Sequence, residues 1–185
     1  MDFNISLHPQ AQNYLFEHYR SVRFIFNDVL GHLEVDYISI ALLNKKSELI
    51  LFSSRPAIEH NLIERHLWKD DPCLQESFFL KNKIHIWNHI YQEPGRLYLK
   101  HYKLEKPKLS FAMSIPAKHE QFQVAYSFGV TTLDESIHME LMNKTETLSG
   151  IGRFCLQNIL SELRLFYPEL SNQSHLKLIP NTSNI

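Results

Sequence analysis

The residue types most able to do chemistry here are histidine, cysteine and aspartate, and they gather in residues 70–89. His85 and His89 stand four residues apart, a spacing that presents two metal ligands on one face if the segment is helical. No spacing rule places a third ligand, residues 84–87 alternate like a strand, and eleven histidines make chance pairs common. We therefore expect neither a metal site nor a bound cofactor.

Catalytic groups are equally sparse. Cys73 has no partnered base that the sequence can identify, and a small packed thiol is the commoner role of such a residue. Asp70 and Asp71 are adjacent, so their carboxylates cannot easily face one substrate as an acid–base pair. The chain contains no P-loop, GxGxxG, GxSxG or HExxH motif. The sequence therefore predicts no catalytic residues and a protein that is not an enzyme.

Asp71 and Pro72 form the most informative pair in this region. An aspartate N-cap followed by proline at the first helical position would explain both residues by helix initiation alone. In a second interpretation the Asp71 carboxylate accepts a hydrogen bond from a ligand. That interpretation depends on the elements that surround the pair.

Apolar periodicity predicts the elements of the first half of the chain. Residues 8–33 repeat apolar side chains every three or four positions, which indicates one long amphipathic helix. Residues 35–43 and 49–52 are rich in β-formers and flank the turn sequence NKKS, which predicts a β-hairpin. Pro56 suits the first turn of a helix that runs to Trp68.

An irregular middle precedes a second regular region. Residues 70–107 indicate short helices and irregular connections. At the end of this region, residues 96–108 predict a short helix whose lysines form its solvated face. Residues 109–115 and 122–130 predict a second antiparallel pair, joined by the polar loop 116–121.

A long helical region closes the chain's regular part and reaches about Phe166. Thr132 and Glu135 fit a capping box at its start. Gly150 and Gly152 either allow one helix to pack closely or mark a break between two helices.

This order of elements predicts one α/β (α+β) domain, a PAS/GAF-like α-β-α sandwich in which helices flank a central antiparallel sheet. A single core suits 185 residues with 44% hydrophobic content. We assign residues 1–166 to this domain. Residues 167–185, rich in Asn, Ser and Pro, are expected to be a linker or a disordered tail.

Charge and cysteine usage restrict the partners and the compartment. A net charge of −1, from 19 basic and 20 acidic residues, gives no reason to expect a polyanionic partner. Two cysteines without CxxC spacing, and no signal peptide or membrane-spanning run, predict a reduced cytoplasmic protein with no membrane contact.

Residues 53–87 carry a resemblance to a known family. The sequence SSRPAIEHNLIERHLWKDDP, followed by IHIWNHI, has an X-Pro pair that starts a helix, then Asp-Pro, then Trp. This order resembles the autoinducer-binding domain of LuxR-type quorum-sensing transcriptional regulators. The likeness covers roughly residues 10–165 and rests on the order and spacing of short motifs.

The resemblance implies a ligand pocket between the sheet and the middle helices. In the family the Asp of Asp-Pro accepts a hydrogen bond from the ligand amide, which implies that role for Asp71. The following Trp packs or donates in the pocket, which points to Trp87, and a hydroxyl on the late strand points to Ser127. Trp68 is either a further aromatic wall or ordinary core. Tyr37, on the segment that resembles the early central strand, completes the predicted set.

Two departures from the family bear on the ligand. Arg55 stands where the family has tyrosine before proline, and Glu59 stands where an aromatic is expected one turn into the helix. Charged side chains in place of two aromatic walls disfavour a mostly apolar acyl-homoserine lactone. The ligand is therefore expected to be a different small molecule.

The function implied by the resemblance is that of a sensory domain of a LuxR-like transcriptional regulator. A homodimer is expected, with DNA contacted only through a C-terminal domain that this chain lacks. The alternative is a stand-alone protein-interaction module that dimerises with or regulates a full-length regulator through its long terminal helices.

Overall fold

The computed structural model describes residues 5–167 and 170 of the chain. At its centre lies a six-stranded sheet of order β1-β3-β2-β6-β5-β4, in which the β1–β3 pair is parallel and the other pairs are antiparallel. The strands are β1 (Ser6–Leu7), β2 (Tyr37–Leu43), β3 (Glu48–Ser53), β4 (His85–Ile86), β5 (Phe111–His119) and β6 (Phe122–Val130).

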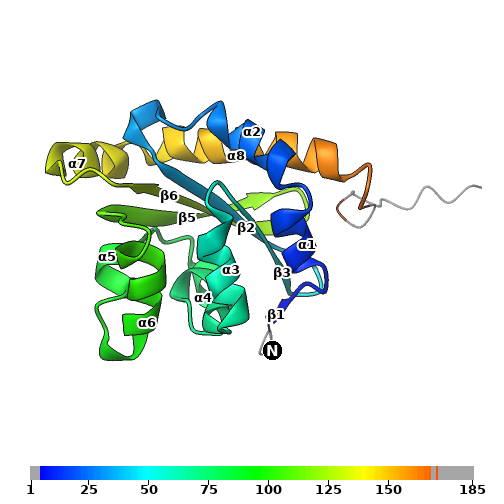
Figure 1. The fold of residues 1–185 in the computed structure, drawn as a ribbon, viewed down its shortest axis with the longest axis horizontal. Coiled ribbons are helices and arrows are strands. Elements are labelled where there is room, and N and C mark those ends of the chain that lie inside the picture. Colours follow the sequence, from blue (N-terminus) through cyan, green and yellow to red (C-terminus); the bar gives the residue numbers. More distant parts are fainter. Residues whose placement is uncertain (1–4, 168–169, 171–185) are drawn as a thin grey trace, which may run out of the picture.

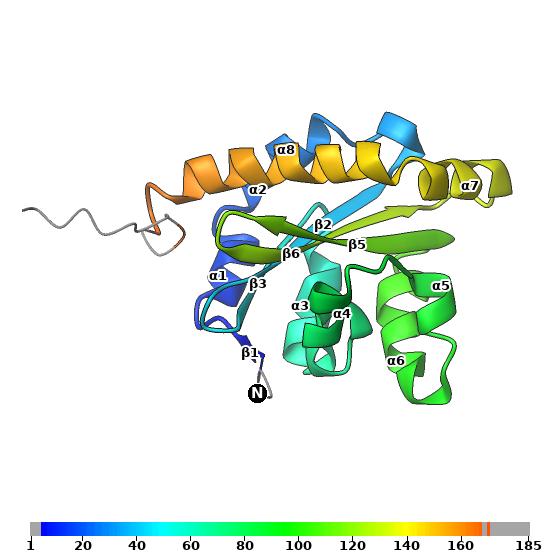
Figure 2. The same ribbon diagram turned by 180° about the vertical axis from the view of Figure 1, so that it is seen from behind.

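Helices cover both faces of this sheet (Figures 1 and 2). One face carries α2 (Tyr19–Asn27) and α8 (Thr145–Leu163), with α7 (Glu135–Asn143) at their end. The opposite face carries the short helices and turns of the middle of the chain. They are α3 (Pro56–Glu64), η2 (Leu67–Lys69), η3 (Pro72–Leu74), α4 (Glu76–Lys81), α5 (Trp87–Ile90), η4 (Pro94–Arg96), α6 (Leu97–Lys100) and η5 (His101–Glu105). The predicted α/β class, a sheet flanked by helices, is confirmed.

The two faces of the sheet carry different side chains. Along β2, Ile38, Ile40 and Leu42 point to α8, and Tyr37 and Ala41 point to the α3–α6 side. Every residue of β2 is buried, because helices cover both faces of the sheet.

The two predicted hairpins are both present. β2 pairs with β3, and β5 pairs with β6. The expected loop 116–121 is wrong, because Pro116 pairs with Ala125 within the ladder and β5 continues to His119. β4 pairs only with Met113 and Ser114, so β5 is an edge strand at Pro116, where proline is tolerated.

The N-terminal helix predicted over residues 8–33 is wrong in its length. The chain forms α1 (Ala11–Phe16) and α2, and η1 (His32–Glu34) follows. α1 buries Ala11 and Leu15 in the apolar layer of the α3 side and Tyr14 in the layer of α8, whereas α2 buries Val22 and Phe26 in the layer of α8. α1 thus contributes side chains to both layers and α2 to one, and the chain bends between the two helices.

Two predicted helix starts have different outcomes. Pro56 begins α3, as expected, although α3 ends at Glu64 and η2 continues the turn. The capping box from Thr132 is wrong, because Asp134 is the N-cap of α7 and its side chain accepts from the Ser136 amide at 2.9 Å.

The long helical region predicted to reach Phe166 breaks at Lys144, between α7 and α8, and not at the glycines. Gly152 lies in the middle of α8, where an added Cβ would come within 2.5 Å of the Tyr126 ring. Of the two alternatives, close packing is therefore the role of Gly152.

Within the described residues, no helix combines the length and the apolar character needed to cross a lipid bilayer. The tail predicted over residues 167–185 falls, apart from residues 167 and 170, outside the described part.

Candidate functional site

A row of buried hydroxyls crosses the sheet on the α3–α6 side. Ser53, Ser39, Ser127 and Ser114 are paired in register across β3, β2, β6 and β5. All four are buried. Their neighbours on this face include small residues, namely Ala41, Ala112 and Ala125. Because these side chains are short, they leave room between the sheet and the helices, and large polar side chains fill it.

Asp71 lies at the centre of that polar layer and has no exposed surface. It is the N-cap of η3, with Pro72 at the first position, so the helix-initiation interpretation is confirmed. Its Oδ1 accepts from the Cys73 amide at 3.0 Å and from the Tyr91 hydroxyl at 2.7 Å. Its Oδ2 accepts from the Lys103 ammonium at 2.6 Å. The carboxylate therefore holds three segments of the chain together.

The burial of Lys103 differs from what the sequence predicts. Residues 96–108 were expected to expose their lysines, but Lys103 is 4% exposed. Its Nζ lies 3.7 Å from the centre of the Trp87 ring and 5.2 Å from that of Tyr91. The prediction is wrong at this position because η5 is a π-turn, in which the Lys106 amide donates to the His101 carbonyl at 2.8 Å. The wider turn changes which side chains face inward.

Trp87 connects this cluster to the hydroxyl row. Its indole Nε1 donates to Ser114 Oγ at 2.8 Å, and Ser114 Oγ lies 2.8 Å from Ser127 Oγ. The Trp87 ring packs edge-on against Tyr37, with centroids 5.8 Å apart, and tilts against Tyr91. The indole is thereby fixed from the sheet side and from the helix side.

Glu59 and Tyr37 form a second buried polar pair beside the first. The Tyr37 hydroxyl donates a short hydrogen bond to Glu59 Oε1. Burial raises the pKa of the Glu59 carboxyl, although hydrogen bonding with the side chains of Ser53 and Tyr37 opposes the shift. Burial and the nearby Glu59 charge raise the pKa of Tyr37 well above its usual value. Glu59 Oε2 is buried and has no hydrogen-bond partner among the described residues.

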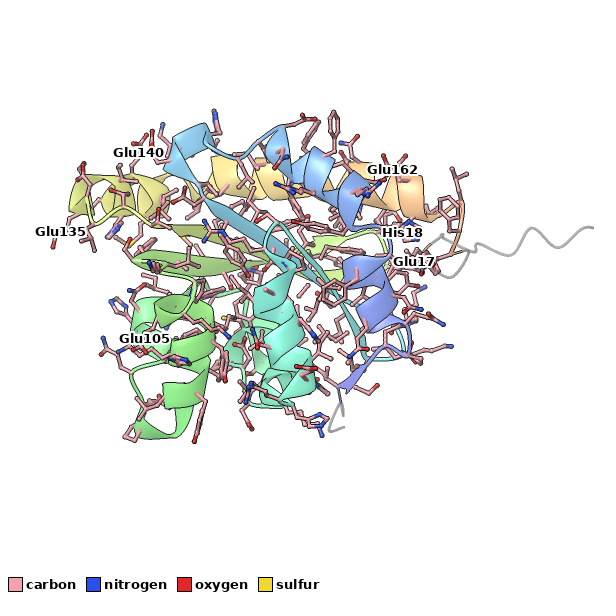
Figure 3. All side chains as sticks on the ribbon, viewed as in Figure 1. Glu17, His18, Glu105, Glu135, Glu140 and Glu162 are labelled. Atoms are coloured by element: carbon pink, nitrogen blue, oxygen red, sulfur yellow. The ribbon has the colours of Figure 1, made fainter. Side chains whose placement is uncertain are left out.

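These two carboxyls are buried, whereas the other acidic residues in the described part of the chain are not. Figure 3 shows Glu105, Glu135, Glu140 and Glu162 at the periphery of the molecule, where each is exposed. Acidic side chains are seldom fully buried unless they are paired, so the interior position of Asp71 and Glu59 requires a specific reason.

The structure links four of the five predicted residues by hydrogen bonds and ring contacts. Asp71, Trp87, Ser127 and Tyr37 are linked by the hydrogen bonds and ring contacts above. Trp68 belongs to the same apolar layer as Trp87, with the Lys69 ammonium 5.6 Å from its ring centre. Their role toward a ligand stays a prediction.

Sequence reasoning missed Ser114, Tyr91 and Lys103. Ser114 could have been found, because it and Ser127 are equally distant from the turn of the β5–β6 hairpin and therefore pair. Lys103 has no such signal, since its burial depends on the π-turn and on a partner 32 residues away.

The groups considered for catalysis do not assemble into a reactive site. Burial raises the pKa of the Cys73 thiol to about 12, so the thiol is neutral near pH 7 even though His85 Nδ1 lies 4.0 Å from the sulfur. Asp70 is exposed while Asp71 is buried, so the two carboxylates diverge.

His85 and His89 do not share a helix, because His85 belongs to β4 and His89 to α5. In the described ranges, no three His, Cys, Asp or Glu side chains are grouped as metal binding requires.

Comparison with known proteins identifies the fold. The sequence matches no protein-family model and no curated protein. The structure is similar to CepR2 of Burkholderia cenocepacia, an N-acylhomoserine lactone dependent LuxR family transcription factor, with a TM-score of 0.57 and 14% identity over 83% of this chain and 99% of that chain. It is also similar to Escherichia coli SdiA, with a TM-score of 0.52 and 13% identity over 78% of this chain. The chain spans 64% of the length of the SdiA chain. The resemblance inferred from residues 53–87 is confirmed for the fold.

Proposed function

We propose that this chain is the ligand-sensing domain of a LuxR-like transcriptional regulator, and that its ligand is not a standard acyl-homoserine lactone. The ligand would bind between the sheet and the segment α3–η5. The fold shared with CepR2 supports the class of protein, and the chemistry of the buried layer supports the departure from the usual ligand.

The single observation that carries this proposal is the polar interior on one face of the sheet. The α8 face is packed with large apolar side chains, whereas the other face buries Asp71, Glu59 and Lys103. Replacing a buried ion pair by well-packed apolar residues is often neutral or stabilising, so such a cluster is not needed for folding alone. Burial raises the pKa of Glu59, and a perturbed ionisable group within such a cluster is typical of functional sites.

The unpaired Glu59 oxygen indicates what the ligand must offer. Buried polar atoms are nearly always hydrogen-bonded, so Glu59 Oε2 is an acceptor position that a ligand donor would satisfy. An unsubstituted acyl-homoserine lactone has one donor, its amide N–H, which the family resemblance assigns to Asp71, so its acyl chain has no donor for this oxygen. The expected ligand is a small polar molecule with N–H or O–H groups.

A hollow beside the cluster offers the ligand a route. It has a volume of about 260 Å³ and lies between α3 and η5, the segments that carry Glu59 and Lys103. Its lining includes Ile58, Tyr102 and Pro107. Displacement of η5 away from α3 would extend this hollow to the buried layer.

Thermal shift and native mass spectrometry test this function. We expect N-octanoyl-homoserine lactone to leave the melting temperature unchanged, and a molecule that co-purifies with the protein, or a hit from a panel of small polar amines and alcohols, to raise it by about 3–6 °C at ten times Kd. Glu59→Gln should reduce that shift. Glu64→Gln, on the exposed side of the same helix, is the matched control.

Two outcomes would contradict the proposal. Stabilisation by the octanoyl lactone would indicate that the ligand is a standard acyl-homoserine lactone. The absence of both a co-purified molecule and any panel hit would count against ligand sensing. If the ligand raises the melting temperature of Glu59→Gln as much as that of the wild type, Glu59 does not contact the ligand.

An exposed apolar surface favours the second candidate function, a protein-interaction module. Phe24 of α2, Phe154 of α8 and Leu165 surround a hollow between the two helices, and their exposed fractions are 70%, 46% and 82%. Exposed apolar patches of this kind mark protein–protein contacts. The expected homodimer, or a contact with a full-length regulator, would bury this surface.

Sedimentation distinguishes this surface from others. If the chain is a dimer at micromolar concentration, Phe154→Asp should shift it to monomer, because a charge would be buried without a partner. Leu133→Asp, at an exposed position before α7, should leave the dimer intact. A wild type that is strictly monomeric and binds no partner would contradict the interaction role.

A further inference from the structure

The Lys103 ammonium sits in an enclosure built from a carboxylate and two aromatic rings. Asp71 Oδ2 accepts from it at 2.6 Å, and the centres of the Trp87 and Tyr91 rings lie 3.7 Å and 5.2 Å away. Asp71, Trp87 and Tyr91 have no exposed surface. These three side chains, which we call the cage, surround the cation on several sides without solvent.

The cage has the composition of a binding site for organic cations. Aromatic faces attract a cation through the negative potential above the ring, and the attraction grows when water is excluded. A carboxylate supplies the compensating charge and the hydrogen-bond acceptor. Each wall is itself held in place, since Tyr91 donates to Asp71 and Trp87 donates to Ser114. The cage is therefore preorganised and does not depend on Lys103 for the placement of its rings.

Lys103 reaches the cage from an unusual backbone. It lies on the π-turn η5, and its neighbours Lys100 and Lys106 lie at the surface, where Lys100 pairs with Glu105. π-turns are uncommon and occur often at functional sites. A regular α-turn would give this segment a different set of inward side chains, so the π-turn is the local feature that delivers the ammonium.

We propose that Asp71, Trp87 and Tyr91 form a cation-binding cage whose resident occupant is the ammonium of Lys103, and that an external ligand of this cage is a small organic ammonium that displaces Lys103. The inference rests on the proposed function only in taking this layer as the ligand site. It adds the chemical class of the ligand, and it identifies the Lys103 side chain as a tethered competitor for the same cage.

The charge balance explains why the displacing group is a cation. When Lys103 leaves, the buried Asp71 carboxylate loses its counter-charge, and an uncompensated buried charge is strongly unfavourable. A neutral donor can replace the hydrogen bond but not the charge. An ammonium replaces both and also keeps the contact with the two rings, while the lysine side chain gains hydration outside.

Chemical rescue tests the cage directly. Lys103→Ala deletes Cγ, Cδ, Cε and Nζ, the atoms of n-propylammonium, and should lower the melting temperature by on the order of 10 °C. We expect n-propylammonium chloride to restore about 3–6 °C at ten times its Kd. The wild type should bind n-propylammonium at least about tenfold more weakly, because the tethered lysine occupies the cage.

Matched controls separate the cage from general effects. Sodium chloride and 1-propanol, at equal concentration, should not rescue Lys103→Ala, because neither supplies an organic cation. Lys100→Ala removes the same atoms from a partly exposed lysine three residues earlier and should show no response to n-propylammonium. Adding Asp71→Asn to Lys103→Ala should abolish the preference for n-propylammonium over 1-propanol.

The result that overturns the cage is an equal response of Lys103→Ala to 1-propanol and n-propylammonium, or no response to either. If Lys103→Ala does not fold, Lys103→Met keeps the stem and removes the charge. Lys103→Met should then be stabilised by the addition of Asp71→Asn, and the opposite result would also overturn the cage. Rescue without any natural ligand in the mass spectra would leave the cage standing and contradict only the sensing function.

Discussion

Replacing Asp71 with alanine is expected to lower the free energy of unfolding by about 3–5 kcal/mol, the loss typical of removing one partner from a buried ion pair. The carboxylate accepts from the Lys103 ammonium, the Tyr91 hydroxyl and the Cys73 amide, and alanine would leave these three donors buried without it. Urea denaturation with a shared m-value measures the difference.

The size of this loss distinguishes two roles of Asp71. If the side chain acted only as the N-cap of η3, Asp71→Ala would cost about 1 kcal/mol and Asp71→Asn almost nothing. Because the structure also shows an ion pair, Asp71→Asn should cost more than a cap exchange, since asparagine caps as well as aspartate but carries no charge. Asp70→Ala, at the exposed neighbouring position, should stay within about 0.5 kcal/mol of the wild type.

A double-variant cycle checks that the loss belongs to the pair. Lys103→Met and Asp71→Asn should each destabilise the protein, and the double variant should be more stable than the sum of the two losses predicts. The coupling expected for two contacting groups is about 0.5–3 kcal/mol. Additive losses would mean that the ion pair contributes little in the folded protein.

Gly152→Ala is expected to destabilise the protein by about 1–3 kcal/mol, although alanine is the better helix former by about 1 kcal/mol. The new Cβ would lie 2.5 Å from Tyr126 Cγ and 2.6 Å from its Cδ1. Contact at that distance is not tolerated, so α8 must move away from β6 or the buried Tyr126 ring must rotate. Thermal and urea unfolding both report the loss.

Gly150→Ala provides the matched control on the same helix. Nothing lies within 4 Å of the Cβ that it would add, so the higher helix propensity of alanine acts alone and should stabilise the protein by about 0.5–1 kcal/mol. Opposite signs for two glycines two residues apart would show that packing against Tyr126 decides the outcome. Stabilisation by both substitutions would contradict the close approach of α8 to the sheet.

The features read correctly from the sequence are those that depend on neighbours along the chain. The β-hairpins followed from β-rich segments joined by turns, and the start of α3 at Pro56 followed from the missing amide of proline. The N-cap role of Asp71 is also local, because it involves the amide of Cys73, two residues away. The short-range order of motifs in residues 53–87 was enough to indicate the fold.

The features that the sequence did not reveal depend on contacts between distant segments. The chain bends between α1, which contributes side chains to both apolar layers, and α2, which contributes to one, although their combined periodicity predicts one helix. The N-cap of α7 is Asp134 and not Thr132. Thr132 Oγ1 accepts from the Asp134 amide, and Asp134 Oδ1 accepts from the Ser136 amide in the first turn of the helix. Local propensity rates both residues as good caps, so the fold of the preceding segment selects between them.

The candidate site shows the same division. Residue types and family order pointed to Asp71, Trp87 and Ser127, but their connection through Ser114 depends on the register of β5 and β6. Lys103 was assigned to a solvated face because a lysine among helically spaced apolar residues is ordinarily exposed. It is buried because a π-turn redirects it toward a carboxylate from another segment, and no periodicity along the chain encodes a partner 32 residues away.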